Sequence, residues 1–143
     1  MVSSADSLLY MSLYSGALAN SAAITASRHS NSYVVTASVD YIDFRNPINI
    51  GEIVILKSQV NRVFRTSMEI GVKVFSENAL TGERKHTTTA YVTFVALDAA
   101  TSEPKSVAAV ILKTAEEKRR WREAGQRRKA RLALRYKKSR AKD

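Results

Sequence analysis

The stretch Tyr33-Val-Val-Thr-Ala-Ser-Val-Asp-Tyr-Ile-Asp43 gives the first indication of the fold, because its side chains alternate between apolar and mostly polar. The odd positions from 33 to 41 hold Tyr, Val, Ala, Val and Tyr, while the even positions from 34 to 40 hold Val, Thr, Ser and Asp. Successive side chains of a β-strand point to opposite faces of the sheet. The alternation therefore predicts a strand with one apolar face.

Three further strands are predicted downstream, each rich in β-branched or aromatic residues. They cover residues 52–64, 67–76 and 86–97. Turn-forming residues separate them, with Gly82 before the last strand and Pro104 marking a break after it. Four consecutive strands joined by short connections indicate an antiparallel meander, in which each strand pairs with the next one in the chain.

Upstream of the strands, residues 5–27 are predicted to form a helix. No charged residue occurs between Asp6 and Arg28, and most positions there are Leu, Ala, Ser or Tyr. A helix without a charged face is buried rather than superficial. One hydrophobic helix followed by four strands predicts an α+β domain in which the sheet wraps around the central helix.

The net charge of +10 lies entirely at the C-terminal end of the chain. Residues 1–112 contain nine Lys/Arg and nine Asp/Glu, whereas residues 113–143 contain fourteen Lys/Arg and four Asp/Glu. This asymmetry predicts two parts with different roles, a neutral domain over 1–112 and a basic helical extension over 113–143.

The basic extension is expected to begin with Thr114 as N-cap and with Glu116 and Glu117 in its first turn. Its apolar seam is thin and consists of Trp121, Ala124, Leu132 and Tyr136. A helix this polar is expected to dock weakly.

Composition excludes several kinds of site. The chain has no cysteine, which rules out disulfides and thiolate chemistry, and only His29 and His86 as imidazoles, so no metal site is expected. No apolar run is long enough to span a bilayer, and the N-terminus lacks the basic region of a secretory signal. We therefore expect a soluble, cytoplasmic protein, with an organellar matrix as the alternative.

A series of short motifs in fixed order resembles the acyl-CoA thioesterase family of the hotdog-fold superfamily. Together they extend over roughly residues 18 to 130, and their order and spacing are more specific than any one of them. The motifs are SRHSNSYVVTASVDYIDFRNPI at 27–48, RTSME at 65–69, ENALTGERK at 77–85, TFVALD at 93–98 and TAEEK at 114–118.

This resemblance implies a hotdog fold and the hydrolysis of acyl-CoA to free fatty acid and CoA. It implies no cofactor, since coenzyme A is part of the substrate. Family members form homodimers through the sheet, often assembled as trimers of dimers, with the active site at the dimer interface. An acid near the start of the central helix activates water or attacks the thioester, and a Gly-Gly pair precedes it.

The chain departs from the family pattern at the catalytic position. Counted back from Arg28, the family's aspartate falls on Ala19, its acidic neighbour on Asn20, and the Gly-Gly pair near Met11-Ser12. The strand that normally precedes the helix is missing. Three explanations stay open: the domain is inactive, a partner chain supplies the acid, or the motif lies outside this sequence.

The candidate site residues follow from the same resemblance. Asn20 is the catalytic candidate, because its amide can orient a water although it cannot act as a base. The candidates for substrate and CoA binding are polar or cationic side chains suited to phosphate or pantetheine; they are Arg28, Thr36, Ser38, Arg65, Thr66 and Ser67.

Each candidate also has a plainer interpretation. A helix C-terminus favours a cation such as Arg28 for electrostatic reasons. Thr36 and Ser38 alternate on one strand face, which can equally be the solvent face. The hydroxyls around Arg65 can simply cap a tight turn. Asn20 can be a polar residue that bonds across a dimer.

The basic extension leaves three functions open. It can keep the protein soluble, attract the phosphates of CoA, or bind nucleic acid through residues 113–143. Combined with Ala19, the last of these gives the alternative function, in which a catalytically inactive hotdog domain serves as a structural or RNA-binding component of a ribonucleoprotein assembly.

Overall fold

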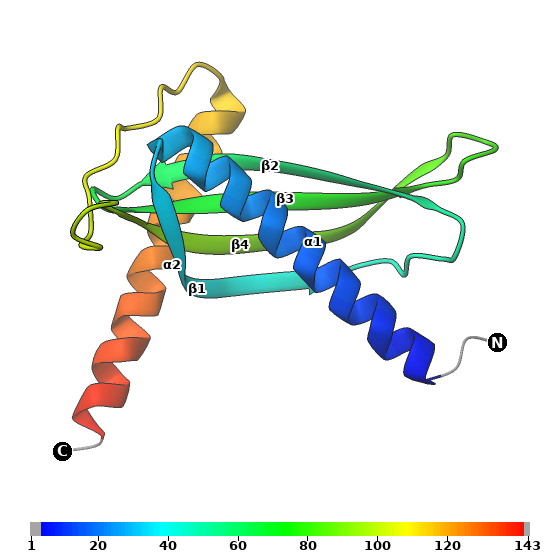
Figure 1. Cartoon of the computed structure of the whole chain (residues 1–143), viewed down its shortest axis with the longest axis horizontal. Coiled ribbons are helices and arrows are strands. Elements are labelled where there is room, and N and C mark those ends of the chain that lie inside the picture. Colours follow the sequence, from blue (N-terminus) through cyan, green and yellow to red (C-terminus); the bar gives the residue numbers. More distant parts are fainter. Residues whose placement is uncertain (1–3, 142–143) are drawn as a thin grey trace.

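The computed structural model describes the backbone of residues 4–141 and the side chains of residues 15–141. Its elements confirm both predicted helices and all four predicted strands (Figure 1). In chain order they are α1 (Ser4–Ser30), β1 (Tyr33–Phe44), β2 (Ile53–Val63), β3 (Ser67–Glu77), β4 (Arg84–Leu97) and α2 (Ala115–Arg140).

The four strands form one antiparallel sheet in the order β1-β4-β3-β2. β2, β3 and β4 follow one another as hairpins, but β1 pairs with β4, with Tyr33 opposite Leu97 and Phe44 opposite Thr88. The connection from β1 to β2 therefore crosses from one edge of the sheet to the other, so the predicted meander is wrong for β1. β1 and β2 are the two edge strands.

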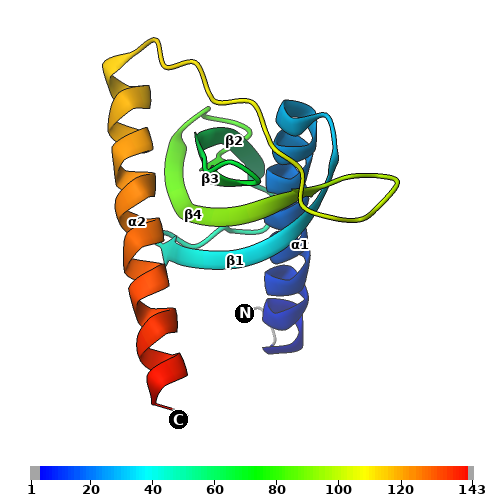
Figure 2. The same cartoon turned by 90° about the vertical axis from the view of Figure 1, so that its left-hand side faces the viewer.

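α1 packs against one face of the sheet, which curves around it (Figure 2). Leu18, Ala22 and Ala26 recur at every fourth position and are buried, because this spacing puts them on one side of the helix. The sheet residues buried against them are Met68, Ile70, Val72, Val74, Ala90, Val92, Phe94 and Ala96.

The other side of α1 is open in the single chain. Ile24 is 53% exposed, and Ala19 and Asn20 are exposed as well. The prediction of a helix buried all round is therefore wrong for the isolated chain, because one four-stranded sheet covers only one side of it.

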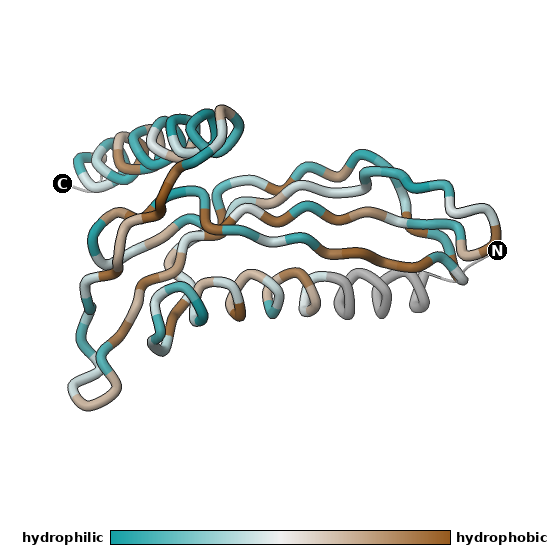
Figure 3. Tube along the Cα trace, turned by 90° about the horizontal axis from the view of Figure 1, so that it is seen from above, coloured by the Kyte–Doolittle hydropathy of each residue, from teal (hydrophilic) through white to brown (hydrophobic). Residues whose placement is uncertain are grey.

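α2 lies across the opposite face of the sheet (Figure 3). Thr114 is its N-cap, as predicted: its hydroxyl accepts a hydrogen bond from the Glu117 backbone N–H at 3.1 Å, and the Glu117 carboxylate accepts one from the Thr114 N–H at 2.9 Å. The hydrogen bonds from the Thr114 and Lys113 backbone N–H groups hold the pKa of the Glu117 carboxyl below its ordinary value.

The predicted apolar seam of α2 is mostly exposed, and arginines of α2 form ion pairs with the sheet instead. In the seam only Ala124 is buried, while Leu132 and Tyr136 are 47% and 64% exposed. Arg127 instead forms a two-pronged ion pair with Glu69 at 2.7 and 3.0 Å, and Arg131 pairs with Asp40.

The partners of these arginines lie in the middle of the sheet. Glu69 on β3 is only 1% exposed and also accepts a hydrogen bond from the Asn61 amide at 2.9 Å. Burial lowers the pKa of the Arg127 guanidinium, but the hydrogen bonds and charge of Glu69 outweigh this, so the pKa lies above its ordinary value. The ring of Tyr91 lies 3.7 Å from the Arg127 guanidinium carbon. The buried carboxylate is thus fully paired.

The first half of α2 packs closely against Arg62 of β2. The guanidinium of Arg62 on β2 lies 3.5 Å from the Trp121 ring centroid. A Cβ at Gly125 would lie 2.3 Å from Arg62 Nη1, so a larger residue at this position would displace the arginine. Glycine at this position leaves room for the end of the Arg62 side chain against the helix.

Candidate functional site

The candidate residues Arg65, Thr66 and Ser67 form the tight connection between β2 and β3. Phe64 N–H donates to the Ser67 carbonyl at 2.7 Å, which closes the turn. Arg65 has a φ of +75°, a left-handed conformation that costs a residue with a side chain about 1–2 kcal/mol. Its side chain is exposed, whereas Thr66 and Ser67 are partly buried.

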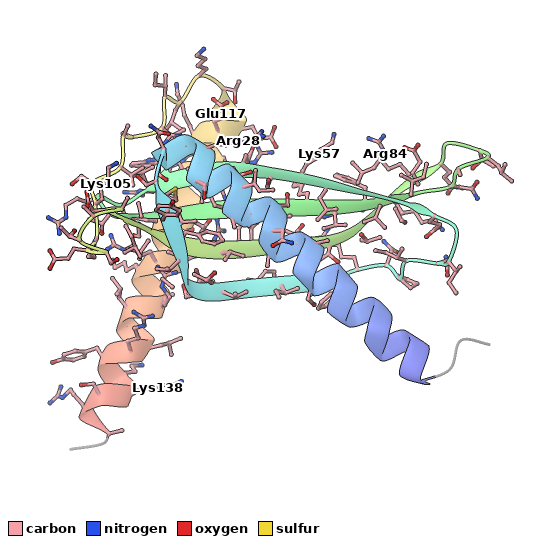
Figure 4. All side chains as sticks on the ribbon, viewed as in Figure 1. Arg28, Lys57, Arg84, Lys105, Glu117 and Lys138 are labelled. Atoms are coloured by element: carbon pink, nitrogen blue, oxygen red, sulfur yellow. The ribbon has the colours of Figure 1, made fainter. Side chains whose placement is uncertain are left out.

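The end of α1 lies beside this turn, because both contact the same connecting segment. The Val107 N–H donates to the Arg65 carbonyl at 2.7 Å, and His29 Nε2 lies 2.8 Å from the Ala108 carbonyl oxygen. The structure therefore brings Arg28, at the last turn of α1, to the same end of the molecule as Arg65. Arg28 is exposed there (Figure 4).

Thr36 and Ser38 lie on opposite faces of the sheet, so the prediction that they share a face is wrong. Thr36 is opposite Phe94 and shares the α1 side, whereas Ser38 is opposite Thr93 and shares the α2 side. A register shift between them leaves Ala37 unpaired, and such a bulge changes the side to which the next residues point. In the described part of the chain, the buried Ser38 hydroxyl has no hydrogen-bond partner.

Ala19 and Asn20 directly follow the buried Leu18 in the sequence and lie on the exposed side of α1. Arg28 follows Asn20 by eight positions, which is about 12 Å along the helix axis. α1 begins at Ser4, so Met11 and Ser12, where the family pattern has its Gly-Gly pair, lie inside the helix. Asn20 is therefore on the same helix as Arg28, but not at a helix N-terminus.

A cluster of three hydroxyls between α1 and β2 was not predicted. Ser58 Oγ lies 3.0 Å from Ser21 Oγ and 2.5 Å from Thr25 Oγ1, and it donates to the Ser21 carbonyl at 3.1 Å. The signal available in the sequence was the pair of hydroxyl residues four apart on the buried side of the helix. Ser58 alone in an apolar strand gave no such signal.

The described residues contain no group of three or more His, Asp or Glu placed to hold a metal ion. Neither described helix is long and apolar enough to cross a membrane. Of the candidate residues, Arg28, Arg65, Thr66 and Ser67 lie at one end of the molecule, whereas Asn20 lies further back on α1.

Comparison with known proteins places the chain in a family. The family model described as thioesterase superfamily matches residues 10–83, more than half of the chain. An uncharacterized acyl-CoA thioester hydrolase of Bacillus subtilis is 45% identical over 96 residues, which cover 67% of this chain and 55% of that protein. The human cytosolic acyl coenzyme A thioester hydrolase is 36% identical over 81 residues, which cover 52% of this chain and 21% of that protein.

Solved structures share the fold over most of the chain. An acyl-CoA hydrolase from Bacillus cereus has a TM-score of 0.82 and 38% identity, covering 91% of this chain and 79% of that one. A Staphylococcus aureus acyl-CoA hydrolase, solved with butyryl-CoA and CoA, has a TM-score of 0.82 and 32% identity over 91% and 79% of the two chains. A hexameric acyl-CoA thioesterase has a TM-score of 0.75 and 39% identity over 92% and 80%.

Three further structures of the S. aureus enzyme carry alanine in place of an aspartate, a threonine and an asparagine. The threonine lies seventeen residues after the aspartate. The same distance separates Ala19 from Thr36 in the present chain.

The chain spans only about half the length of the B. subtilis relative. A family model matches most of the central helix and the first strands, and the solved acyl-CoA hydrolases share the fold over 91% of the chain. The chain therefore belongs to the acyl-CoA thioesterase family of the thioesterase superfamily, with the hotdog fold.

Proposed function

We propose that the protein is an acyl-CoA thioester hydrolase. Water attacks the thioester carbonyl, the carbon–sulfur bond breaks, and free acid and the CoA thiol leave. The observation that supports this proposal is the likeness to solved acyl-CoA hydrolases over 91% of the chain, at 32–38% identity. No metal or cofactor is needed for this reaction, because water and a polarised carbonyl suffice.

The CoA phosphates are expected at the end of the molecule where Arg28 and Arg65 lie. A guanidinium donates in a fork that matches phosphate oxygens, and Thr66 and Ser67 add hydroxyls and turn N–H groups next to Arg65. The pantetheine arm would then run along α1 from Arg28 towards Asn20.

The thioester is expected between α1 and β1, near Asn20 and Thr36. The spacing between position 19 and Thr36 supports this, since it equals the spacing of the aspartate and threonine that were each replaced by alanine in the S. aureus enzyme. Thr36 is on the α1 side of the sheet. Ser38 points to the α2 side, so we leave it out of the proposed site.

Asn20 is proposed to orient the attacking water. Its amide can donate to and accept from a water, but it cannot take up a proton at neutral pH. Ala19 contributes no acid or base. We therefore expect slow hydrolysis by the chain itself, with binding and orientation supplying most of the acceleration.

The protein is proposed to assemble through the free edge of β1, first as a homodimer and then as a trimer of dimers. β1 is a twelve-residue edge strand, and Tyr33, Val35 and Val39 on it are 73%, 47% and 53% exposed. An edge of this length with apolar side chains is a template for another strand. The hexameric relative supports such an assembly.

The neutral and basic parts of the chain are proposed to act together rather than as separate modules. Arg127 and Arg131 point into the sheet and are unavailable to an outside ligand such as RNA. A cytoplasmic location is proposed as well, supported by the cytosolic human relative.

The proposal is tested by incubating the protein with acyl-CoA in water enriched in oxygen-18 and analysing the acid by mass spectrometry. One heavy oxygen in the free acid, formed faster than in a protein-free control, is the expected result. Free acid at the rate of the control for every acyl chain would refute the proposed activity.

A further inference from the structure

The face of the sheet turned away from α1 carries a groove beside the first turns of α2, with a volume of about 380 Å³. Gly71, in the middle of β3, lines the groove together with the Asn61 amide that packs against it. A Cβ there would lie 2.7 Å from Asn61 Nδ2. The charged side chains that line this outer groove are Arg45, Lys57, Lys73, Arg119, Arg120, Asp43 and Glu123.

The arginines of the outer groove are paired with acids. Arg45 pairs with Asp43 at 2.7 Å, and Arg119 with Glu123 at 3.0 Å. Arg120 pairs with Glu116, which stands just outside the groove. Each of these contacts neutralises one positive charge.

Lys57 and Lys73 carry the remaining positive charge. Within the described part of the chain neither forms an ion pair, and both are exposed. The Lys57 ammonium lies 5.6 Å from the Phe75 ring centroid, and Lys57 lines the groove. The outer groove therefore has two ammonium groups with no anion to balance them.

These two lysines stand directly opposite each other on neighbouring strands. Lys57 of β2 and Lys73 of β3 are register partners, which places their Cβ atoms about 5 Å apart on the same face. Like charges in this arrangement destabilise a sheet. An anion held between them would turn the repulsion into two attractive contacts.

We propose that the outer groove binds a small anion with two or more phosphate groups, between Lys57 and Lys73. Lysine ammonium groups are common phosphate ligands, and Gln59 and Arg120 stand beside them as further donors. The volume is in the range of small-molecule clefts. The site is separate from the proposed acyl-CoA site, because α1 and Thr36 are on the other face of the sheet.

Pyrophosphate is the probe, titrated calorimetrically into the whole protein at constant ionic strength. We expect saturable binding, and the double variant Lys57→Gln with Lys73→Gln should weaken it on the order of a hundredfold, because two charged contacts are lost. The control is Lys137→Gln with Lys138→Gln, which removes the same charge at the far end of α2 (Figure 4). It should change the affinity about twofold at most, since salt screens charges at that distance.

Several results would overturn the proposal. They are no binding of pyrophosphate to the unmodified protein, equal losses in the two double variants, or complete displacement of pyrophosphate by CoA, which would assign the groove to the CoA phosphates. The melting temperature without pyrophosphate is a second measurement that tests the proposal. It should stay equal or rise in Lys57→Gln with Lys73→Gln, and a fall would contradict the repulsion between the lysines.

Discussion

At the scale of single residues, positions 19 and 65 have the largest expected influence on activity. Ala19 stands where the family has its acid, and it lies exposed on α1 beside Asn20. Arg65 is held in a left-handed conformation at the turn proposed to hold the CoA phosphates. A strained residue at an exposed turn points to a use for its side chain, because glycine would relieve the strain.

Ala19→Asp is expected to accelerate thioester hydrolysis by about 10²–10⁴-fold, the usual contribution of a general base. The measurement is the initial rate of thiol release with one acyl-CoA at saturation. Ala19→Asn is the matched control, since it has nearly the same shape but cannot accept the proton. Equal rates for the two variants would mean that position 19 does not face the thioester.

Arg65→Gly is expected to raise the KM for acyl-CoA roughly tenfold, through the loss of a charged contact. Its stability should be unchanged or higher, because glycine adopts the left-handed conformation freely. Arg65→Lys keeps the charge and should change the KM less. If the KM of Arg65→Gly equals that of the unmodified protein, the arginine does not bind the substrate.

At the scale of elements, α2 is held by charge where a typical surface helix is held by apolar contacts. Glu69 is buried, and Arg127 and Asn61 satisfy its carboxylate from two different elements. The sequence predicted the span of α2 and its N-cap, because both are local features. It could not predict the ion pair, whose partners are 58 residues apart.

Arg127→Ala is expected to lower the free energy of unfolding by about 3–5 kcal/mol, because it leaves the Glu69 carboxylate buried without its partner. Urea denaturation measures this. The exposed Arg135 gives the control, and Arg135→Ala should stay within about 0.5 kcal/mol of the unmodified protein. Replacing both partners, as Glu69→Leu with Arg127→Met, should restore much of the loss, and a double variant no better than Arg127→Ala would contradict the pairing.

Glu117→Gln is expected to reduce the loss of stability in acid. The folded-state pKa of Glu117 is below its ordinary value, so its contribution is present above the unfolded-state pKa and is lost as the pH falls through the folded-state pKa. Melting temperatures from neutral pH down to acid should therefore decline less steeply in Glu117→Gln. An identical slope would show that the capping carboxylate does not contribute.

At the scale of the whole molecule, the sequence predicted which segments form helices and strands better than how they pair. Hydrophobic periodicity identified β1 to β4, but the pairing of β1 with β4 depends on contacts over long sequence separations. The bulge at Ala37, which sends Thr36 and Ser38 to opposite faces, depends on the partner strand and has no local signal. The charges of the outer groove likewise come together only through strand register and the docking of α2.

Val39→Asp is expected to dissociate the oligomer, because it places a charge on the apolar edge of β1 where a second copy would pair. Sedimentation velocity should show the monomer, with the circular dichroism of the fold retained. Ile111→Asp, at an exposed apolar position of the connecting segment, is the control and should leave the assembly intact. An unchanged oligomer in Val39→Asp would place the interface elsewhere.

The most direct test of the central claim is the rate of thiol release from a panel of acyl-CoAs of increasing chain length. The protein contains no cysteine, so every thiol detected comes from the substrate. We expect thiol release above the spontaneous rate, in proportion to protein concentration, for at least one chain length. Release no faster than the spontaneous rate across the whole panel would contradict it.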